Sequence, residues 1–339
     1  MNASAHRPAP VLLLDQATVS ALITPDDCIA AVESAFAAHA LGRTLAPELM
    51  HLDAEGGEFH IKAGGLRSGW RSGTGCYVTC KINGGFFGNR AALGLPNIIG
   101  LILLSDGATG SPLAVMESGY ITRLRTGAAT AVAARYLARA NSTTVTLCGA
   151  GSQGEMQLRC LARCLPIERV CVWSRGGSAV FSERMAGELK LDIKPVRDLA
   201  AATRDSDVIV TSTPSTAWFL GAQHVRPGTF VAAIGADSPA KQELEPELVA
   251  NSSVVCDIAA QCAEVGDLHH AIAAGLMTAA DIRGELGAVI AGLAPKRLRA
   301  DETIIFDSTG TALQDAAAAI LVYERAKALG RGESFAFWS

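Results

Sequence analysis

The segment Thr144–Gly154, TVTLCGAGSQG, decides the fold of this chain. Its first half is a short run rich in β-branched residues, which is typical of a buried strand. The chain then turns through Gly149, Gly151 and Gly154 into GEMQLRCLARCL, whose apolar residues recur at helical spacing. A strand, a glycine-rich turn and a helix in this order form the fingerprint of a dinucleotide-binding unit.

Each glycine of this turn has a physical reason. Gly149 permits a tight turn, Gly151 lets the backbone approach a pyrophosphate, and Gly154 lets the new helix lie close to its strand. The free N–H groups and the positive dipole end of the helix favour phosphate. A glycine-rich turn in an α/β domain that binds nothing is the alternative. The residues expected to bind the cofactor here are Gly149, Ala150, Gly151, Ser152, Gln153 and Gly154.

Composition narrows the class of protein. The chain has 339 residues, 49% of them hydrophobic and 18% charged, so it has room for two domains or one large one around a sizeable core. A net charge of −4 without long basic runs argues against nucleic acid as a partner. No apolar run is long enough for a membrane span, and the opening MNASAHRPAP is expected to be a polar lead and not a signal peptide. The odd number of cysteines, nine, predicts reduced thiols in a cytoplasmic protein, and their spacing predicts no metal site.

The hydrophobic pattern changes twice along the chain. Residues 11–42 read as a strand followed by an amphipathic helix, 48–115 as a meander of antiparallel strands, and 121–140 as an Ala-rich helix. Strands then alternate with helices, which implies a parallel, doubly wound sheet, and a last helix ends at Gly330. We expect the last helix to return to the N-terminal part, so that the nucleotide-binding domain is an insertion. The strands of this second part are expected at 144–149, 169–173, 192–196, 207–213, 229–235, 253–258 and 303–310.

The residues after the second strand of the nucleotide unit bear on the choice of cofactor. An acidic residue about 20 residues beyond the glycines usually binds the adenine ribose of NAD. Here Ser174 and Arg175 stand at that point, and no carboxylate follows the strand. A guanidinium and a hydroxyl suit a 2′-phosphate, so NADP(H) is favoured and NAD(H) is the alternative. Arg175 as a solvated loop residue is the competing interpretation.

Three cations stand out near apolar sequence. Lys62 and Lys81 lie in the middle of predicted strands, and Arg125 precedes the long helix. A strand lysine is often only an edge residue with its ammonium in water. Three cations near one domain junction instead suggest a site for a carboxylate, which Arg125 would bind through two hydrogen bonds.

Asp237 follows the strand TFVAAIGA at its carboxyl end, the edge of a doubly wound sheet where ligands bind. A carboxylate there is expected to exchange a proton with a substrate nitrogen. The alternative is an N-cap for a helix near Pro239.

Several motifs together resemble the ornithine cyclodeaminase/mu-crystallin family over nearly the whole chain. The RTGAA and GADxxxKxEL segments are specific in combination. The matching stretches are CKINGGFFGN (80–89), GLPNIIGLILLSDGATGSPLAVMES (94–118), ITRLRTGAATAVAARYLAR (121–139), CGAGSQG (148–154), GADSPAKQEL (235–244) and FDSTGTALQDAAA (306–318).

The resemblance implies an α/β fold. A Rossmann-type parallel sheet, residues 126–310, is inserted in an α+β substrate-binding and dimerisation domain, residues 1–125 and 311–339. A homodimer is expected. Lys81 and Arg125 would be ligands of the substrate carboxylate, and Asp237 the acid/base group. The residues expected along the cofactor, besides the glycine turn, Ser174 and Arg175, are Thr126, Thr213, Ser308 and Thr309.

Two departures from the family pattern concern the carboxylate clamp. Many members carry an arginine shortly after a proline where this chain has Glu48, and Arg43 does not fill that slot. Cyclodeaminases also read like ELMP where this chain has FHIKAG, which places Lys62 in the pocket region. The clamp is therefore expected to use Lys62 in place of the arginine, and ornithine is disfavoured as substrate.

The resemblance leaves three functions open. The first is an NAD(P)H-dependent imino-acid reductase or amino-acid dehydrogenase, in which Lys81, Arg125 and Lys62 bind the carboxylate and Asp237 serves the nitrogen. The second is a cyclodeaminase that keeps NAD bound and releases ammonia. The third is an NADPH-binding protein without turnover. The partner in each case is a small imino or amino acid, with no role for nucleic acid or membrane.

Overall fold

The computed structural model describes residues 9–71 and 74–338. Most of the polar lead at the N-terminus, residues 1–8, therefore lies outside the described residues. The chain divides into two compact units, each described by itself below. The terminal unit consists of Met1–Arg125 and Thr311–Ser339, and the central unit of Thr126–Gly310.

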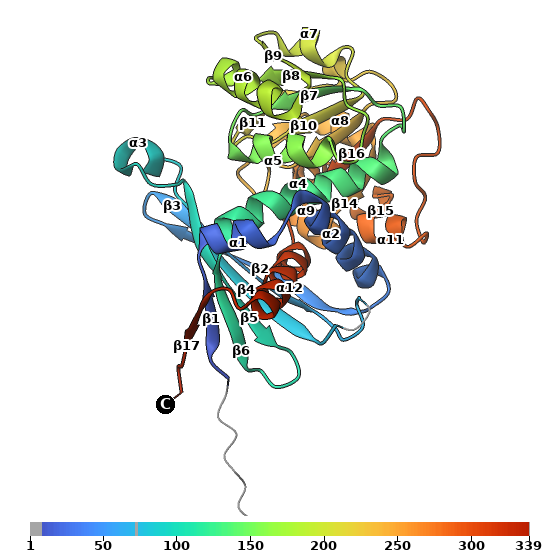
Figure 1. The fold of residues 1–339 in the computed structure, drawn as a ribbon. Helices are drawn as coiled ribbons and strands as arrows, with labels where there is room; N and C mark the ends of the chain where they lie inside the picture. The colour runs from blue at the N-terminus through green and yellow to red at the C-terminus, as the bar shows by residue number, and fades with distance from the viewer. Residues whose placement is uncertain (1–8, 72–73, 339) are drawn as a thin grey trace, which may run out of the picture. The chain divides into compact units, whose positions relative to one another are not determined.

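The terminal unit is built on a seven-stranded sheet in the order β17-β1-β6-β5-β4-β3-β2. Its strands β2 to β6 form the antiparallel meander that alternating residues predicted, whereas β1 pairs parallel to β6. The C-terminal strand β17 was not predicted and runs beside β1 (Figure 1). The strands are β1 (Val11–Leu14), β2 (Thr44–Ala54), β3 (Gly57–Leu66), β4 (Tyr77–Gly85), β5 (Ile98–Asp106), β6 (Pro112–Glu117) and β17 (Glu333–Phe335).

The first predicted helix, with Pro25 at its start, is present, and a short helix that was not predicted precedes it. Thr24 caps the predicted helix through the backbone N–H of Asp27, and Pro25 occupies its first turn, where a missing N–H costs nothing. The last helix ends at Gly330 with φ of +60°, as the sequence predicted. The helices of this unit are α1 (Gln16–Leu22), α2 (Pro25–Ala40), α3 (Asn89–Leu93), the first part of α4 (Ser118–Leu137) and α12 (Ala312–Leu329).

Helix α12 covers one face of the meander, as Figure 1 shows; it packs against α2 and, within the sheet, mainly on β3 and β4. A Cβ on Gly64 of β3 would lie 3.0 Å from the Cβ of Ala312, so the glycine lets the helix lie close to the sheet. We call this the inner face. Lys62 and Lys81 are register partners on it, because side chains of a strand alternate between faces.

The opposite face of the meander, the outer face, is apolar and exposed. Ile82 of β4 pairs with Leu101 of β5, and these two side chains are 46% and 55% exposed. Four further apolar side chains on β2 and β5 lie on the same face and are also exposed. The outer face is defined by Met50, Leu52, Ile82, Ile99, Leu101 and Leu103.

The central unit is built on an eight-stranded sheet in which neighbouring strands are parallel, in the order β15-β14-β16-β12-β10-β7-β8-β9. This confirms the predicted doubly wound α/β fold. The chain leaves β7 toward β8 and later returns on its other side with β10, so a topological switch point lies between β7 and β10. The strands are β7 (Thr144–Cys148), β8 (Arg169–Trp173), β9 (Asp192–Val196), β10 (Val208–Thr211), β12 (Phe230–Ala233), β14 (Ser253–Cys256), β15 (Gly284–Glu285) and β16 (Ile304–Asp307).

A small two-stranded sheet, β11 (Thr216–Leu220) with β13 (Gln242–Leu244), was not predicted. Within the described residues no helix combines the length and the apolar character that a membrane span needs. The helices of the central unit include the rest of α4, α5 (Ser152–Leu161), α6 (Ser178–Leu189), α7 (Leu199–Thr203), α8 (Pro246–Ala250), α9 (Ala259–Val265), α10 (Asp267–Ala273) and α11 (Leu286–Ile290).

Candidate functional site

A cavity of about 420 Å³ opens at the carboxyl ends of β7, β8 and β10. This is the switch point of the sheet, where ligands of open α/β folds bind. Of the residues predicted to bind a cofactor, six line it. In the loop after β10, which follows the strand beside β7, only Thr213 was predicted. The lining comprises Gly149, Ala150, Gly151, Trp173, Ser174, Arg175, Gly176, Ser212, Thr213, Pro214, Ser215 and Phe219.

The glycine turn has the backbone geometry that its sequence implies. Gly149 has φ of +123°, and a Cβ there would lie 2.8 Å from the carbonyl oxygen of Ser212. A Cβ on Gly154 would run into the carbonyl oxygen of Gly149. A Cβ on Gly151, in contrast, would meet nothing within 4 Å. The space beside Gly151 is therefore open to a ligand, and α5 begins at this point, where the first N–H groups of a helix point out of its end.

Two aromatic side chains line the cavity, and none of its lining residues in the described part of the chain is acidic. The rings of Trp173 and Phe219 lie 5.0 Å apart between centroids, at 34°. The hydroxyl of Ser174 donates to the carbonyl oxygen of Gly176 at 2.7 Å, which holds the turn after β8, and Arg175 beside it is exposed. The cavity thus offers flat apolar surface and a cation where NAD-binding domains usually have an acidic side chain.

Glu243 of β13 joins the loops after β10 and β12. Its carboxylate accepts from the backbone N–H and the hydroxyl of Thr213 at 2.6 and 2.7 Å, and from the N–H of Gly235 at 2.8 Å. Burial raises the pKa of Glu243 to about 7, and the charge of Asp267 acts in the same direction. The side chain lies within the GADSPAKQEL motif, and its role in positioning Thr213 was not predicted.

The other residues expected along the cofactor lie outside the cavity lining. Ser152 is exposed at the start of α5, and Gln153 follows it. Thr126 is buried in α4. The hydroxyl of Ser308 donates to Asp257 at 2.9 Å, and that of Thr309 accepts from Gln261 at 2.7 Å. Their assignment to the cofactor stays a prediction.

Asp237 lies beyond the carboxyl end of β12, as predicted. Its carboxylate accepts from the ammonium of Lys241 at 2.6 Å and is about one-third exposed. No helix begins near Pro239, because residues 238–241 form a turn that leads into β13. The N-cap interpretation of Asp237 is therefore wrong.

The three predicted cations are all buried, with exposed fractions of 3% for Lys62, 2% for Lys81 and 5% for Arg125. The interpretation of the lysines as edge residues with solvated ammonium groups is wrong, because β3 and β4 are interior strands under α12. Burial lowers the pKa of Lys81 to about 7; the charges of Arg125 and Lys62 add to this shift, and Asp315 opposes it.

Asp315 in the first turn of α12 links two of these cations. Its oxygens lie 2.7 Å from the ammonium of Lys81 and 3.0 Å from Nε of Arg125, and Arg125 also donates to Gln314 at 2.6 Å. Burial raises the pKa of Asp315, but the charges of Lys81 and Arg125 outweigh it and hold the pKa below its ordinary value. These contacts use only part of the N–H donors of a lysine and an arginine. The cluster of Lys81, Arg125 and Asp315 retains excess positive charge for an anion.

Comparison with known proteins shows to which family the chain belongs. The sequence profile described as the ornithine cyclodeaminase/mu-crystallin family matches residues 10–330.

This chain belongs to the ornithine cyclodeaminase/mu-crystallin family.

Known proteins that are similar to this chain match it over nearly the whole length of both chains. An alanine dehydrogenase of Archaeoglobus fulgidus is 36% identical over 330 residues, 96% of this chain and 98% of its own. The solved structure of an archaeal alanine dehydrogenase dimer with bound NAD superimposes with a TM-score of 0.89 at 36% identity, over 97% of this chain and 99% of its own. The Δ1-pyrroline-2-carboxylate reductase of Thermococcus litoralis, solved with NADH and L-proline, gives 0.90 at 30% identity, over 95% and 99%.

The register of β2 and β3 shows on which face of the sheet this family member carries Glu48, the residue that stands where many members carry an arginine. Leu49 pairs with Lys62 and Glu48 with Ala63, so Glu48 lies on the outer face and Lys62 on the inner face beside Lys81. Glu48 is exposed and does not share the face of the cation cluster. Lys62 remains the candidate third cation.

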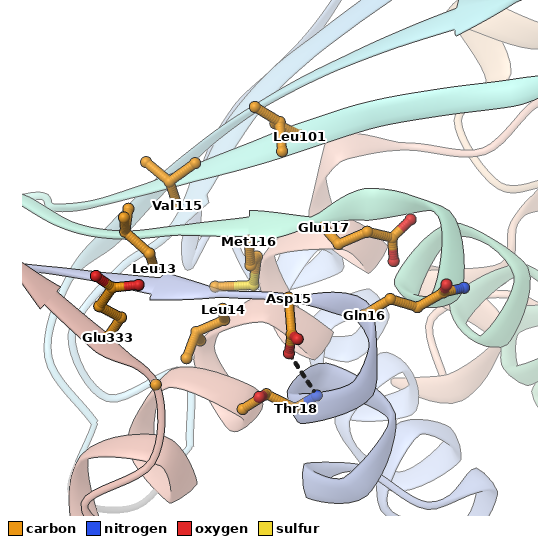
Figure 2. A pocket seen from close by; sticks show the side chains of 11 residues that line it. Leu13, Leu14, Asp15, Gln16, Thr18, Leu101, Val115, Met116, Glu117 and Glu333 are labelled. Atoms are coloured by element: carbon orange, nitrogen blue, oxygen red, sulfur yellow. Dashed lines mark hydrogen bonds between the residues drawn. The ribbon is translucent and has the colours of Figure 1, made fainter.

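A second cavity of this family member, about 600 Å³, lies in the terminal unit between β1, β5, β6 and β17 (Figure 2). Its ionisable lining residues are all acidic: Asp15, which accepts from the N–H of Thr18 at 2.8 Å, Glu117 and Glu333. Because these carboxylates repel a negatively charged ligand, this cavity does not suit an anionic substrate.

Proposed function

We propose that the chain is an NAD(P)H-dependent oxidoreductase that interconverts a 2-imino acid and the corresponding amino acid. The observation that carries this proposal is the buried pair of Lys81 and Arg125, held by Asp315, in a chain whose other unit carries a nucleotide-sized cavity at its switch point. Relatives that match along their full length include an alanine dehydrogenase and a pyrroline-2-carboxylate reductase, which supports this reaction class.

Lys81 and Arg125 bind the carboxylate and thereby fix the α-carbon and its C=N bond. Buried charge-assisted hydrogen bonds are shorter and stronger than neutral ones, and the planar guanidinium adds orientation. Lys62 contributes positive charge from the neighbouring strand. A bound nicotinamide dinucleotide supplies hydride to the α-carbon in the reductive direction and accepts it in reverse.

Asp237 exchanges the proton of the substrate nitrogen, with Lys241 holding its carboxylate. The variant Asp237→Asn is expected to lower kcat by about 10²–10⁴-fold, the usual contribution of a general acid or base. Asp301→Asn, on an exposed ion pair with Arg299, is the matched control. Steady-state rates of both variants at equal thermal stability provide the measurement, and undiminished turnover of Asp237→Asn would remove this role.

The proposed cofactor is NADP(H), because Ser174 and Arg175 stand where an NAD-binding domain has an acidic residue. Arg175→Ala is expected to weaken NADPH by about tenfold or more, since a hydrogen bond to a charged group contributes about 1.5–3 kcal/mol. Binding of NADH, which lacks the 2′-phosphate, should be weakened little by this substitution. KM for both cofactors is the readout, with exposed Arg169→Ala at the start of β8 as control. Equal losses for the two cofactors, or none, would contradict NADP(H) preference.

The experiment that tests the function is a screen of linear and cyclic 2-imino acids with NADPH and NADH, following cofactor oxidation. Reduction of at least one imino acid is expected. Release of ammonia from ornithine or lysine without net change in reduced cofactor would establish a cyclodeaminase instead. Tight NADPH binding with no turnover on any substrate would establish a binding protein.

We also propose that the chain forms a homodimer through the outer face. Exposed apolar patches of several side chains are typical of protein interfaces, and the archaeal alanine dehydrogenase is a dimer. The outer face of a second copy of the chain would cover this patch, because a two-fold interface pairs the same surface of both subunits.

Charge on the outer face is expected to break this dimer. Ile82→Glu with Leu101→Glu, a register pair, should convert the protein from twice to once the monomer mass in light scattering after size-exclusion chromatography. The matched control is Leu293→Glu with Leu298→Glu, two exposed leucines of the central unit. A monomeric parent protein, or a dimer that survives the first double variant, would show that the outer face is not the interface.

A further inference from the structure

Two histidines and a glutamate gather at the end of the β2–β3 hairpin, away from any assigned role. His51 and His60 are direct register partners on the two strands, and their ring centroids lie 4.9 Å apart. Glu58 lies two residues before His60 on β3, so its side chain is on the same inner face. We call His51, Glu58 and His60 the hairpin cluster.

The distances in the hairpin cluster match those of a metal site before its ligands close on the ion. One ligand atom from each of the three residues lies within 4.8 Å of the other two. Glu58 stands between the imidazoles, with oxygens 3.8 Å from Nε2 of His51 and 3.5 Å from Nε2 of His60. Ligands of a tetrahedral zinc ion lie about 2.0–2.2 Å from the metal, and hence a little over 3 Å from one another. Small rotations of three side chains would reach that geometry.

The ligand types select the kind of ion. Two imidazoles with one carboxylate suit zinc, cobalt, nickel or copper, whereas magnesium and calcium prefer oxygen ligands alone. The side chains of His51, Glu58 and His60 are 30%, 19% and 12% exposed, so an ion has access from solvent while the ligands are held by the sheet. Asp53, 3.2 Å from His51 and 96% exposed, is available as a further oxygen ligand.

We propose that the hairpin cluster binds one divalent transition-metal ion of the zinc class. The ion cross-links β2 to β3 and adds positive charge on the face of the sheet that carries Lys62, two residues along β3 from His60. Catalysis by the proposed oxidoreductase does not depend on it. A cluster of weak histidine–carboxylate ion pairs without an ion is the competing account, and such pairs contribute about 0–1 kcal/mol.

Cobalt(II) is the probe, because its visible spectrum reports coordination geometry and ligand type. Full-length protein, stripped with chelator and checked for retained thermal stability, is titrated with Co²⁺ and then with competing Zn²⁺. We expect one equivalent to bind with the intense visible bands of four-coordinate cobalt. The near-ultraviolet band of cobalt–thiolate should be absent, which separates this site from binding at the half-buried cysteines.

His51→Gln, Glu58→Gln and His60→Gln are each expected to weaken binding by about tenfold or more, because each removes a ligand. Zn²⁺ should raise the melting temperature of the parent protein, by linkage of binding to folding, and not that of His51→Gln, a residue at the hairpin surface. The matched control is His269→Gln, whose ring lies 5.2 Å from that of His270; this pair does not belong to a cluster of three possible metal ligands among the described residues. Absence of saturable binding, a thiolate spectrum, or unchanged affinity in both His51→Gln and His60→Gln would overturn the proposal.

Discussion

Replacing Asp315 by alanine is expected to lower the free energy of unfolding by about 3–5 kcal/mol, the cost of leaving buried charge without its partner. Asp315 contacts Lys81 at 2.7 Å and Arg125 at 3.0 Å, and all three residues are almost fully inaccessible. Without the carboxylate, two cations repel each other under α12. Urea denaturation followed by circular dichroism gives the measurement.

Two controls separate charge from packing at this position. Asp315→Asn keeps the shape and removes the charge, so it should remain strongly destabilised. Asp301→Ala breaks an exposed ion pair with Arg299 and should change stability by at most about 1 kcal/mol. A denaturation midpoint of Asp315→Asn equal to that of the parent would show that the carboxylate is not the counter-ion we assign.

The second large effect is expected on activity. Lys81→Met and Arg125→Met should each lower kcat/KM for an imino acid by about 10²–10⁴-fold, because each loses one or two charge-assisted hydrogen bonds to the carboxylate at about 1.5–3 kcal/mol each. Arg125→Lys keeps the charge and loses the planar guanidinium, so its kcat/KM should lie between those of the parent and Arg125→Met. Purified variants are compared with the parent on the substrate found in the screen, and cofactor KM should stay unchanged. A variant of Lys81 or Arg125 with parental kcat/KM would remove that residue from the clamp.

Lys81 also predicts the sign of a pH dependence. Its pKa is lowered to about 7, so in the free enzyme it loses its charge as pH rises through that value. Affinity for a carboxylate falls with the charge, so kcat/KM should decline on the alkaline side, and this profile reports the free enzyme. Lys81→Arg stays charged throughout and should abolish the limb, though at a lower rate. An alkaline limb that persists in Lys81→Arg would assign it to another group.

Local sequence was enough for the strands of the parallel sheet in the central unit, except for the two-residue β15. The strand, turn and helix around Gly149 depend on hydrophobic periodicity and on backbone conformations that glycine allows, and both are readable over a dozen residues. The cation positions Lys62, Lys81 and Arg125 were also visible, because charge inside an apolar strand pattern is unusual. Strands β11, β13 and β17 escaped prediction because they are short and polar or exposed, and pairing partners define them.

The tertiary structure decided what these charges contact. Asp315 lies 190 residues from Arg125 in sequence, and only the packing of α12 on β3 and β4 makes it the counter-ion of the cluster. The register of β2 on β3 likewise places Glu48 and Lys62 on opposite faces of the sheet and His51 directly opposite His60. Sequence by itself determined the fold class, the nucleotide turn and the cationic residues, since these follow from local periodicity and residue chemistry. Counter-ions, sheet faces and the hairpin cluster depend on long-range pairing, which no local pattern encodes.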